Sequence, residues 1–225
     1  MNPVHFANAV QTSFVFRFLG VPVAVSLWLI LLGVIITLDA SIYIKKMMPN
    51  PYSCGRFTYF CAGVIAAIGT IISIVFHELG HGVVSGWFGI PIVKAGLTGW
   101  GAYVQPAANI LEINPWKEIA IAVAGPLANF LIAGIAAIYV AIRDESLSEN
   151  TVQYLAYINI RLARLNLLPI LVLDGGRVTN GFLRLVFSNN TSFRLTLAIT
   201  FATIIYYLFL RKSRKPVLED KLATL

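Results

Sequence analysis

Long apolar stretches constrain this chain more than any other feature. They cover about residues 21–44, 59–86, 117–142, 151–173 and 193–210, and each is close to the ~20 residues that a helix needs to cross a bilayer core. The chain of 225 residues is 58% hydrophobic and only 12% charged, whereas an average soluble domain is about 25% charged. We therefore expect an all-α polytopic membrane protein with about five to six transmembrane helices.

The polar segments between these stretches are short. Because none is long enough for an accessory domain and no secretory signal pattern opens the chain, we expect residues 1–225 to form one membrane-embedded domain, integral to the cell membrane. Cys54 and Cys61 lack the spacing of a zinc ribbon, and we interpret them as free thiols. The basic tail suits an anionic membrane surface, and nothing further supports a nucleic-acid partner.

The second apolar stretch contains the sequence His77-Glu78-Leu79-Gly80-His81. On an α-helix the two histidines share one face, about one turn apart, and the glutamate lies beside them. This spacing is typical of a zinc site in which the histidines bind the metal and the glutamate is the general base. The surrounding sequence is too apolar for a soluble protease, so we expect the site at membrane depth.

A catalytic zinc has three protein ligands and one open position, so one more ligand must come from elsewhere in the chain. The candidates are His5, Asp39, Glu112, Asp144, Glu145 and Asp174. Asp174 alone follows an apolar segment that a proline interrupts, at Pro169, and it precedes two glycines that allow a close backbone approach. The other candidates lie in polar or terminal segments, or, for Asp39, in a span without a motif. We therefore predict that Asp174 completes a site for one Zn²⁺ per chain.

Three motifs in this order resemble those of the site-2 protease family of intramembrane zinc metalloproteases. They are His77-Glu78-Leu79-Gly80-His81, Ala124-Gly125-Pro126-Leu127-Ala128-Asn129, and Asn166-Leu167-Leu168-Pro169 followed by Leu173-Asp174-Gly175-Gly176-Arg177. The resemblance covers about residues 55–187, leaves a C-terminal span and basic tail at 193–225, and is to a minimal form without PDZ or CBS domains. It implies that His77, His81 and Asp174 bind zinc and that Glu78 is the general base.

Four polar residues near these motifs have alternative interpretations. In similar proteins an amide such as that of Asn129 contacts the substrate or the oxyanion, but an interhelical hydrogen bond is the structural alternative. Asn166 either contacts substrate or caps the interrupted helix. Arg161 and Arg164 stand where the family has aliphatic residues. They either snorkel at a shifted span boundary, or line a polar entrance to the zinc, or bind lipid or a partner carboxylate.

The segment 90–106 is rich in glycine and contains two short apolar runs. We expect a short membrane-associated β hairpin or edge strand here, between the second and third spans. Non-helical backbone at membrane depth is costly unless it lines a cavity or is buried in protein, which makes this segment a candidate wall of the site. Gly101, Ala102, Tyr103 and Val104 form a possible edge to which an extended substrate adds as a strand.

Together these patterns predict a zinc-dependent intramembrane endopeptidase that cuts within or near transmembrane segments of other membrane proteins. Its partners would be that substrate and the lipid bilayer, with the oligomeric state open. A non-catalytic protein that binds the transmembrane helices of a partner is the alternative. Two further classes fit the sequence less well. A protease that trims prenylated proteins would take a glutamate as its third ligand, whereas this chain has Asp174. A metal transporter would need polar ligands spread along a path, whereas this chain has one cluster of them.

Two patterns in the sequence favour opposite orientations in the membrane. The family resemblance implies a zinc site nearer the cytosolic face, and Arg177, Arg184 and Arg194 favour this orientation. With five spans the basic tail would then lie outside, against the positive-inside rule. Either the span count differs by one, or the core overrides the bias of the tail.

Overall fold

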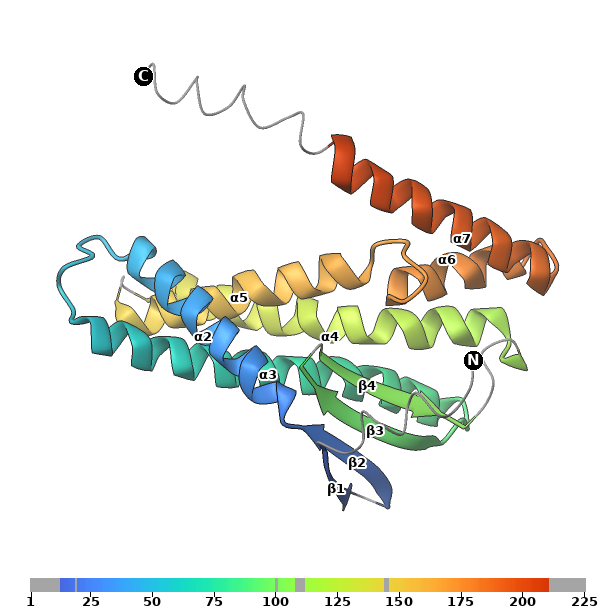
Figure 1. Cartoon of the computed structure of the whole chain (residues 1–225), viewed down its shortest axis with the longest axis horizontal. Coiled ribbons are helices and arrows are strands. Elements are labelled where there is room, and N and C mark those ends of the chain that lie inside the picture. The colour runs from blue at the N-terminus through green and yellow to red at the C-terminus, as the bar shows by residue number, and fades with distance from the viewer. Residues whose placement is uncertain (1–12, 19, 100, 108–111, 144–145, 211–225) are drawn as a thin grey trace.

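The chain folds into a bundle of helices with a four-stranded sheet beside it (Figure 1). The computed structural model describes residues 13–18, 20–99, 101–107, 112–143 and 146–210. The elements in chain order are β1 (Ser13–Phe18), β2 (Val21–Ser26), α2 (Trp28–Met47), α3 (Arg56–Trp87), β3 (Ile92–Thr98), β4 (Gly101–Pro106), α4 (Pro115–Ala141), α5 (Leu147–Asn166), α6 (Asp174–Arg184) and α7 (Asn189–Ile205). A π-helical segment, Tyr206–Leu210, continues α7.

In the described ranges, four helices are long and apolar enough to cross a membrane. These are α2, α3, α4 and the helix that runs from Asn189 to Phe209. The expected stretch at 151–173 corresponds to α5, which has 20 residues but is less apolar and contacts α2, α3 and α4. The chain is thus mainly helical and multi-pass, and a count of five to six spans stays a prediction.

The first span begins later in the chain than the sequence predicts. Residues 21–26 form strand β2, and α2 starts only at Trp28. An apolar run does not by itself distinguish a strand from a helix, and here the β-branched valines of the run favour the extended backbone while Pro22 disfavours a helix interior. Strand β1 precedes this strand, and residues 1–12 lie outside the described residues.

The sheet has the order β1-β2-β3-β4. Two antiparallel hairpins, β1–β2 and β3–β4, are joined by the parallel pairing of Val23–Val25 with Ala95–Leu97. The hairpin expected at 90–106 is therefore confirmed, but it belongs to a larger sheet. Strand β4 contacts α3 and forms one edge of the sheet, and β1 forms the other edge.

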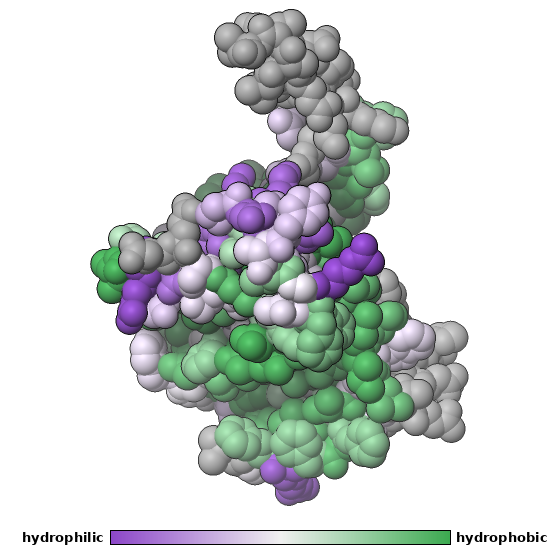
Figure 2. Space-filling model, turned by 90° about the vertical axis from the view of Figure 1, so that its left-hand side faces the viewer, coloured by the Kyte–Doolittle hydropathy of each residue, from purple (hydrophilic) through white to green (hydrophobic). Residues whose placement is uncertain are grey.

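Large apolar side chains point outward from the bundle. On α2, Trp28, Ile30 and Leu31 are at least half exposed, and hydrophobic side chains cover much of the face in Figure 2. The interior is rich in small and polar residues: Ala40 and Ala66 are fully buried, and a side chain at Gly63 would collide with α2. Small residues let membrane helices approach closely, so this distribution fits a lipid environment.

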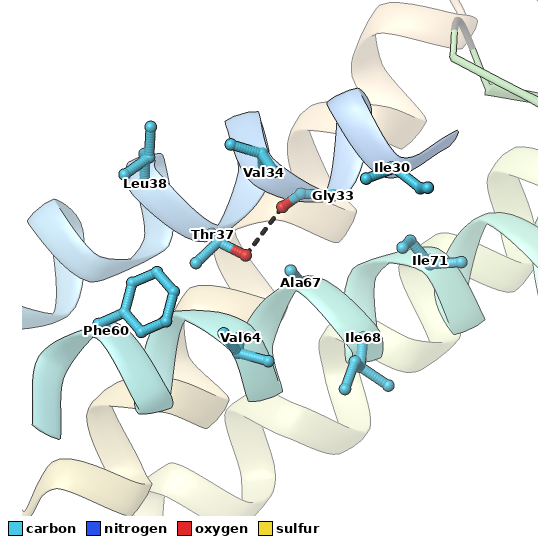
Figure 3. A pocket seen from close by; sticks show the side chains of 10 residues that line it. All are labelled: Ile30, Gly33, Val34, Thr37, Leu38, Phe60, Val64, Ala67, Ile68 and Ile71. Carbon is cyan, nitrogen blue, oxygen red and sulfur yellow. Dashed lines mark hydrogen bonds between the residues drawn. The ribbon is translucent and has the colours of Figure 1, made fainter. Parts of the chain in front are cut away.

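An apolar groove lies between α2 and α3 (Figure 3). It has a volume of about 280 Å³ and is lined by Ile30, Gly33, Val34, Thr37, Leu38, Phe60, Val64, Ala67, Ile68 and Ile71. Its one polar side chain, Thr37, donates its hydroxyl to the Gly33 carbonyl at 2.8 Å. Because the lining offers no titratable group, the chemistry of this protein must be sought elsewhere.

Candidate metal centre

Helix α3 presents His77, Glu78 and His81 near its C-terminal end. The two imidazoles are four residues apart and therefore on one face, with Nε2 atoms 3.2 Å apart and rings nearly perpendicular. Both are buried, at 5% and 4% exposure, while Glu78 is partly exposed. One ligand atom from each of the three residues lies within 4.8 Å of the others, a grouping that is able to hold a metal ion.

Asp174 reaches the same point from the first residue of α6. Its Oδ2 lies 3.1 Å from His77 Nε2 and its Oδ1 lies 3.3 Å from His81 Nε2. The irregular segment after α5 contains Pro169, which ends the helix and turns the chain back. A Cβ at Gly175 would overlap the carbonyls of Leu167 and Leu168, so the second residue of α6 must be glycine for this close approach.

The other ring nitrogens of the two histidines are held by hydrogen bonds. His77 Nδ1 lies 2.6 Å from Asn129 Oδ1, and His81 Nδ1 lies 2.7 Å from the Ile121 carbonyl, both on α4. An imidazole that donates from Nδ1 presents a free lone pair at Nε2, the arrangement that orients histidine as a metal ligand. Both lone pairs and the Asp174 carboxylate converge, so these residues fit a divalent metal.

Gly125 on α4 faces this convergence point. A Cβ at this position would overlap His81 Nε2 and come within 2.7 Å of His77 Nε2. Gly80, between the histidines, has the matching role, because its Cβ would come within 2.7 Å of the Ala124 carbonyl. The backbones of α3 and α4 therefore meet directly at the site, and α4 adds no side chain at Gly125 in front of the two Nε2 atoms, where the Asp174 carboxylate arrives.

Asn129 makes the interhelical hydrogen bonds that were the alternative to a substrate contact. It is fully buried; its oxygen faces His77, and its Nδ2 donates to Asn159 Oδ1 on α5 at 2.8 Å. Asn159 donates in turn to Ser73 Oγ and to the Leu155 carbonyl. Neither Asn159 nor Ser73 is predicted from the sequence motifs, although an asparagine seven residues before Asn166 in the same helix is a usable signal. A substrate role of Asn129 stays a prediction.

The remaining expected residues lie at the border of the site or away from it. Asn166 is the last residue of α5 and is partly buried, next to the Leu167 carbonyl that approaches Gly175. Residues Gly101 to Val104 form the start of the edge strand β4, where Gly101 has a φ of 131° that favours glycine. Their contact with substrate stays a prediction.

The other acidic and basic candidates are placed as follows. Asp39 accepts a hydrogen bond from Tyr154 on α5 at 3.0 Å, and Glu112 is exposed. Arg161 is exposed and donates to Tyr157 at 2.6 Å, its guanidinium also lying over that ring, and Arg164 is exposed. His5, Asp144 and Glu145 lie outside the described residues.

A buried ion pair anchors α6 at the end opposite to Asp174. Arg184 Nη1 donates to Glu118 Oε2 on α4 at 2.6 Å, and the two side chains are 5% and 0% exposed. The same guanidinium donates to the Ile113 carbonyl and to Asn189 at the start of α7. One side chain thus ties α6 to α4 and α7, which limits how far Asp174 is able to move.

Comparison with known proteins gives the family of the chain. The family model "Peptidase family M50" matches residues 65–145 and 137–210. A Synechocystis sp. protein named as a candidate zinc metalloprotease is 32% identical over 163 residues, covering 71% of this chain and 41% of that protein. A zinc metalloprotease of Methanocaldococcus jannaschii is 33% identical over 113 residues, covering 50% of this chain and 32% of that protein.

The fold also has a solved counterpart. The site-2 protease from Methanocaldococcus jannaschii superposes with a TM-score of 0.59 at 24% identity, over 90% of this chain and 87% of that chain. The chain belongs to peptidase family M50, and the resemblance to the site-2 proteases is confirmed. The chain spans less than half the length of the curated relatives that it matches.

Proposed function

We propose that this protein is a zinc-dependent intramembrane endopeptidase that hydrolyses peptide bonds within or near transmembrane segments of other membrane proteins. The observation that carries the proposal is the convergence of His77, His81 and Asp174 beside Glu78, buried between helices that are apolar enough to cross a membrane. Ionisable groups in such a setting are costly and are retained for function. Membership of a metalloprotease family supports the same assignment.

The roles of the residues follow from their chemistry. His77 and His81 through Nε2, and Asp174 through its carboxylate, would hold one zinc ion and leave a position open. When bound, zinc supplies a Lewis acid that makes water nucleophilic at neutral pH. Glu78, one residue from His77 on the same helix, would accept the proton of the attacking water and return it to the leaving amine.

Substrate would reach this site in an extended form, because a helical segment hides its carbonyls in internal hydrogen bonds. Strand β4 is an edge of the sheet and contacts the helix that carries the histidines, which supports strand addition along Gly101 to Val104. Asn166 is the better candidate for an oxyanion donor, since both polar atoms of Asn129 are already engaged.

The orientation that we propose puts the metal centre nearer the cytosolic face. The centre lies at the end of the bundle where α3 ends and α4 begins, and Arg177 and Arg184 lie on α6 at the same end. Arginines flanking spans are enriched on the cytosolic side.

The decisive experiment compares the zinc-loaded full chain with Glu78→Gln on a generic transmembrane substrate. The amide keeps the size of the side chain but does not accept a proton, so cleavage should fall by at least about 10²-fold while one zinc per chain is retained. The control is Glu112→Gln, which changes an exposed acid outside the centre and should leave cleavage intact. Equal cleavage by wild type and Glu78→Gln would refute the mechanism, and binding of substrate without cleavage by either would favour a non-catalytic protein.

A further inference from the structure

A buried chain of polar side chains links three helices behind His77. It runs from Ser73 on α3 through Asn159 on α5 and Asn129 on α4 to His77, and none of the four is more than 5% exposed. The successive contacts are 3.0, 2.8 and 2.6 Å long. Buried amides are costly unless all their groups are paired, so a chain this complete needs a physical reason.

The direction of these hydrogen bonds is set by backbone carbonyls. Asn159 Nδ2 lies 2.8 Å from the Leu155 carbonyl, a group that only accepts. Ser73 donates its hydroxyl to the Gly69 carbonyl at 2.9 Å, which leaves its oxygen to accept from the same Nδ2. The amide of Asn159 is thereby oriented, and its Oδ1 is the atom that faces Asn129.

The orientation is passed on to His77. With Asn159 Oδ1 as acceptor, Asn129 must present its Nδ2 to α5 and its Oδ1 to the imidazole. An acceptor opposite Nδ1 requires the ring hydrogen on Nδ1 and leaves the lone pair on Nε2. If the amide of Asn129 were reversed, the hydrogen would move to Nε2, which faces Asp174 and the second histidine.

We propose that Asn159 is a positioning residue for the metal centre, because it orients the Asn129 amide and so selects the His77 tautomer that is able to bind metal. The two histidines differ in this need. His81 Nδ1 faces the Ile121 carbonyl, which only accepts hydrogen bonds. The partner of His77 is an amide, which presents either an accepting oxygen or a donating nitrogen depending on its orientation. The proposal rests on the proposed function only in taking zinc as the metal.

The test measures zinc affinity of the purified full chain by competition with a chelator. Asn159→Leu removes the acceptor and should weaken zinc binding by about 10–100-fold, the usual effect of losing a group that orients a ligand. Asn159→Asp in its neutral acid form keeps an oxygen toward Asn129 and a hydroxyl toward the Leu155 carbonyl, and should lose much less. The matched control is Asn150→Leu, which removes another buried asparagine of α5 whose amide bonds to Met48 and Ser146 instead.

A second background separates positioning from general packing. In Asn129→Asp a carboxylate faces His77 and accepts from Nδ1 whatever Asn159 does, so Asn159→Leu should cost little further zinc affinity there. An equal loss in both backgrounds, or wild-type affinity in a folded Asn159→Leu protein, would overturn the proposal. Should Asn159→Leu not fold, Asn159→Ala carries the same comparison. Zinc binding by the wild type without any cleavage would refute the proposed peptidase function but would not affect this inference.

Discussion

Gly125 shows how strongly one residue constrains the centre. A methyl group on its α-carbon would occupy the space in front of both imidazole Nε2 atoms. In the sequence this glycine belongs to a motif of small residues, which predicts close helix packing without a specific partner. In the structure its role is specific, because it leaves the room that a metal ion needs.

Gly125→Ala is therefore expected to reduce zinc binding. Overpacking costs about 1–3 kcal/mol, so zinc affinity measured by chelator competition should fall by about 10-fold or more. Gly134→Ala on the same helix is the control, since a Cβ there meets nothing within 4 Å. Unchanged affinity in Gly125→Ala would mean that the metal does not sit between the two Nε2 atoms.

At the scale of elements, α6 is held at both of its ends. Asp174 faces the histidines at its start, and Arg184 pairs with Glu118 at its end. The segment before α6 is anchored as well, because the Leu171 N–H donates to Thr200 on α7 at 3.0 Å. These contacts explain how a carboxylate from an interrupted helix is kept at a defined position inside the bundle.

Strand β4 is the element whose function is open to a direct test. Single proline substitutions at 102, 103 and 104 remove one backbone donor each, and along an antiparallel edge these donors alternate between β3 and the free side. A proline on the free side should abolish cleavage of a transmembrane substrate while zinc affinity persists. Val15→Pro, on the opposite edge strand β1, should have no such effect. Cleavage that survives all three substitutions would exclude strand addition at this edge.

Among the described residues, most large apolar side chains face outward, and the interior is rich in small and polar residues around a few large ones such as Ile44 and Tyr154. Water would penalise this distribution, and lipid does not. The connection after α2 and the start of α5 lie together, since Asn150 Nδ2 contacts Met48 Sδ at 3.3 Å. The metal centre lies toward the other end of α3.

This arrangement predicts the sides on which single cysteines react. In a background with Cys54→Ser and Cys61→Ser, a membrane-impermeant thiol reagent should label Tyr52→Cys and Ser148→Cys from one side. It should label Trp87→Cys and Phe187→Cys from the opposite side, which we expect to be cytosolic. All four positions are exposed. Labelling of Ser148→Cys together with Trp87→Cys would show that α4 does not cross the membrane.

Several features of this protein follow from the sequence alone. Hydrophobic length identifies most of the spans, and helical periodicity puts His77 and His81 on one face, because both depend only on neighbours within a few turns of helix. The proline and glycines around Asp174 and the turn residues of the 90–106 hairpin are equally local signals. The start of α2 was misplaced because strand β2 and the helix after it are both apolar.

Only the tertiary structure decided the rest. Three features join segments that are far apart in the chain: the parallel pairing of β2 with β3, the close approach of the α4 backbone at Gly125 to the imidazoles, and the link from Asn159 to His77. The sequence reads Asn129 and Asn159 as two polar residues in apolar helices, with no indication of which group donates. The Leu155 carbonyl, four residues earlier in α5, orients the Asn159 amide locally. Only the packing of α3, α4 and α5 passes that orientation to Asn129 and His77, because a hydrogen bond acquires its direction from the partner that it meets.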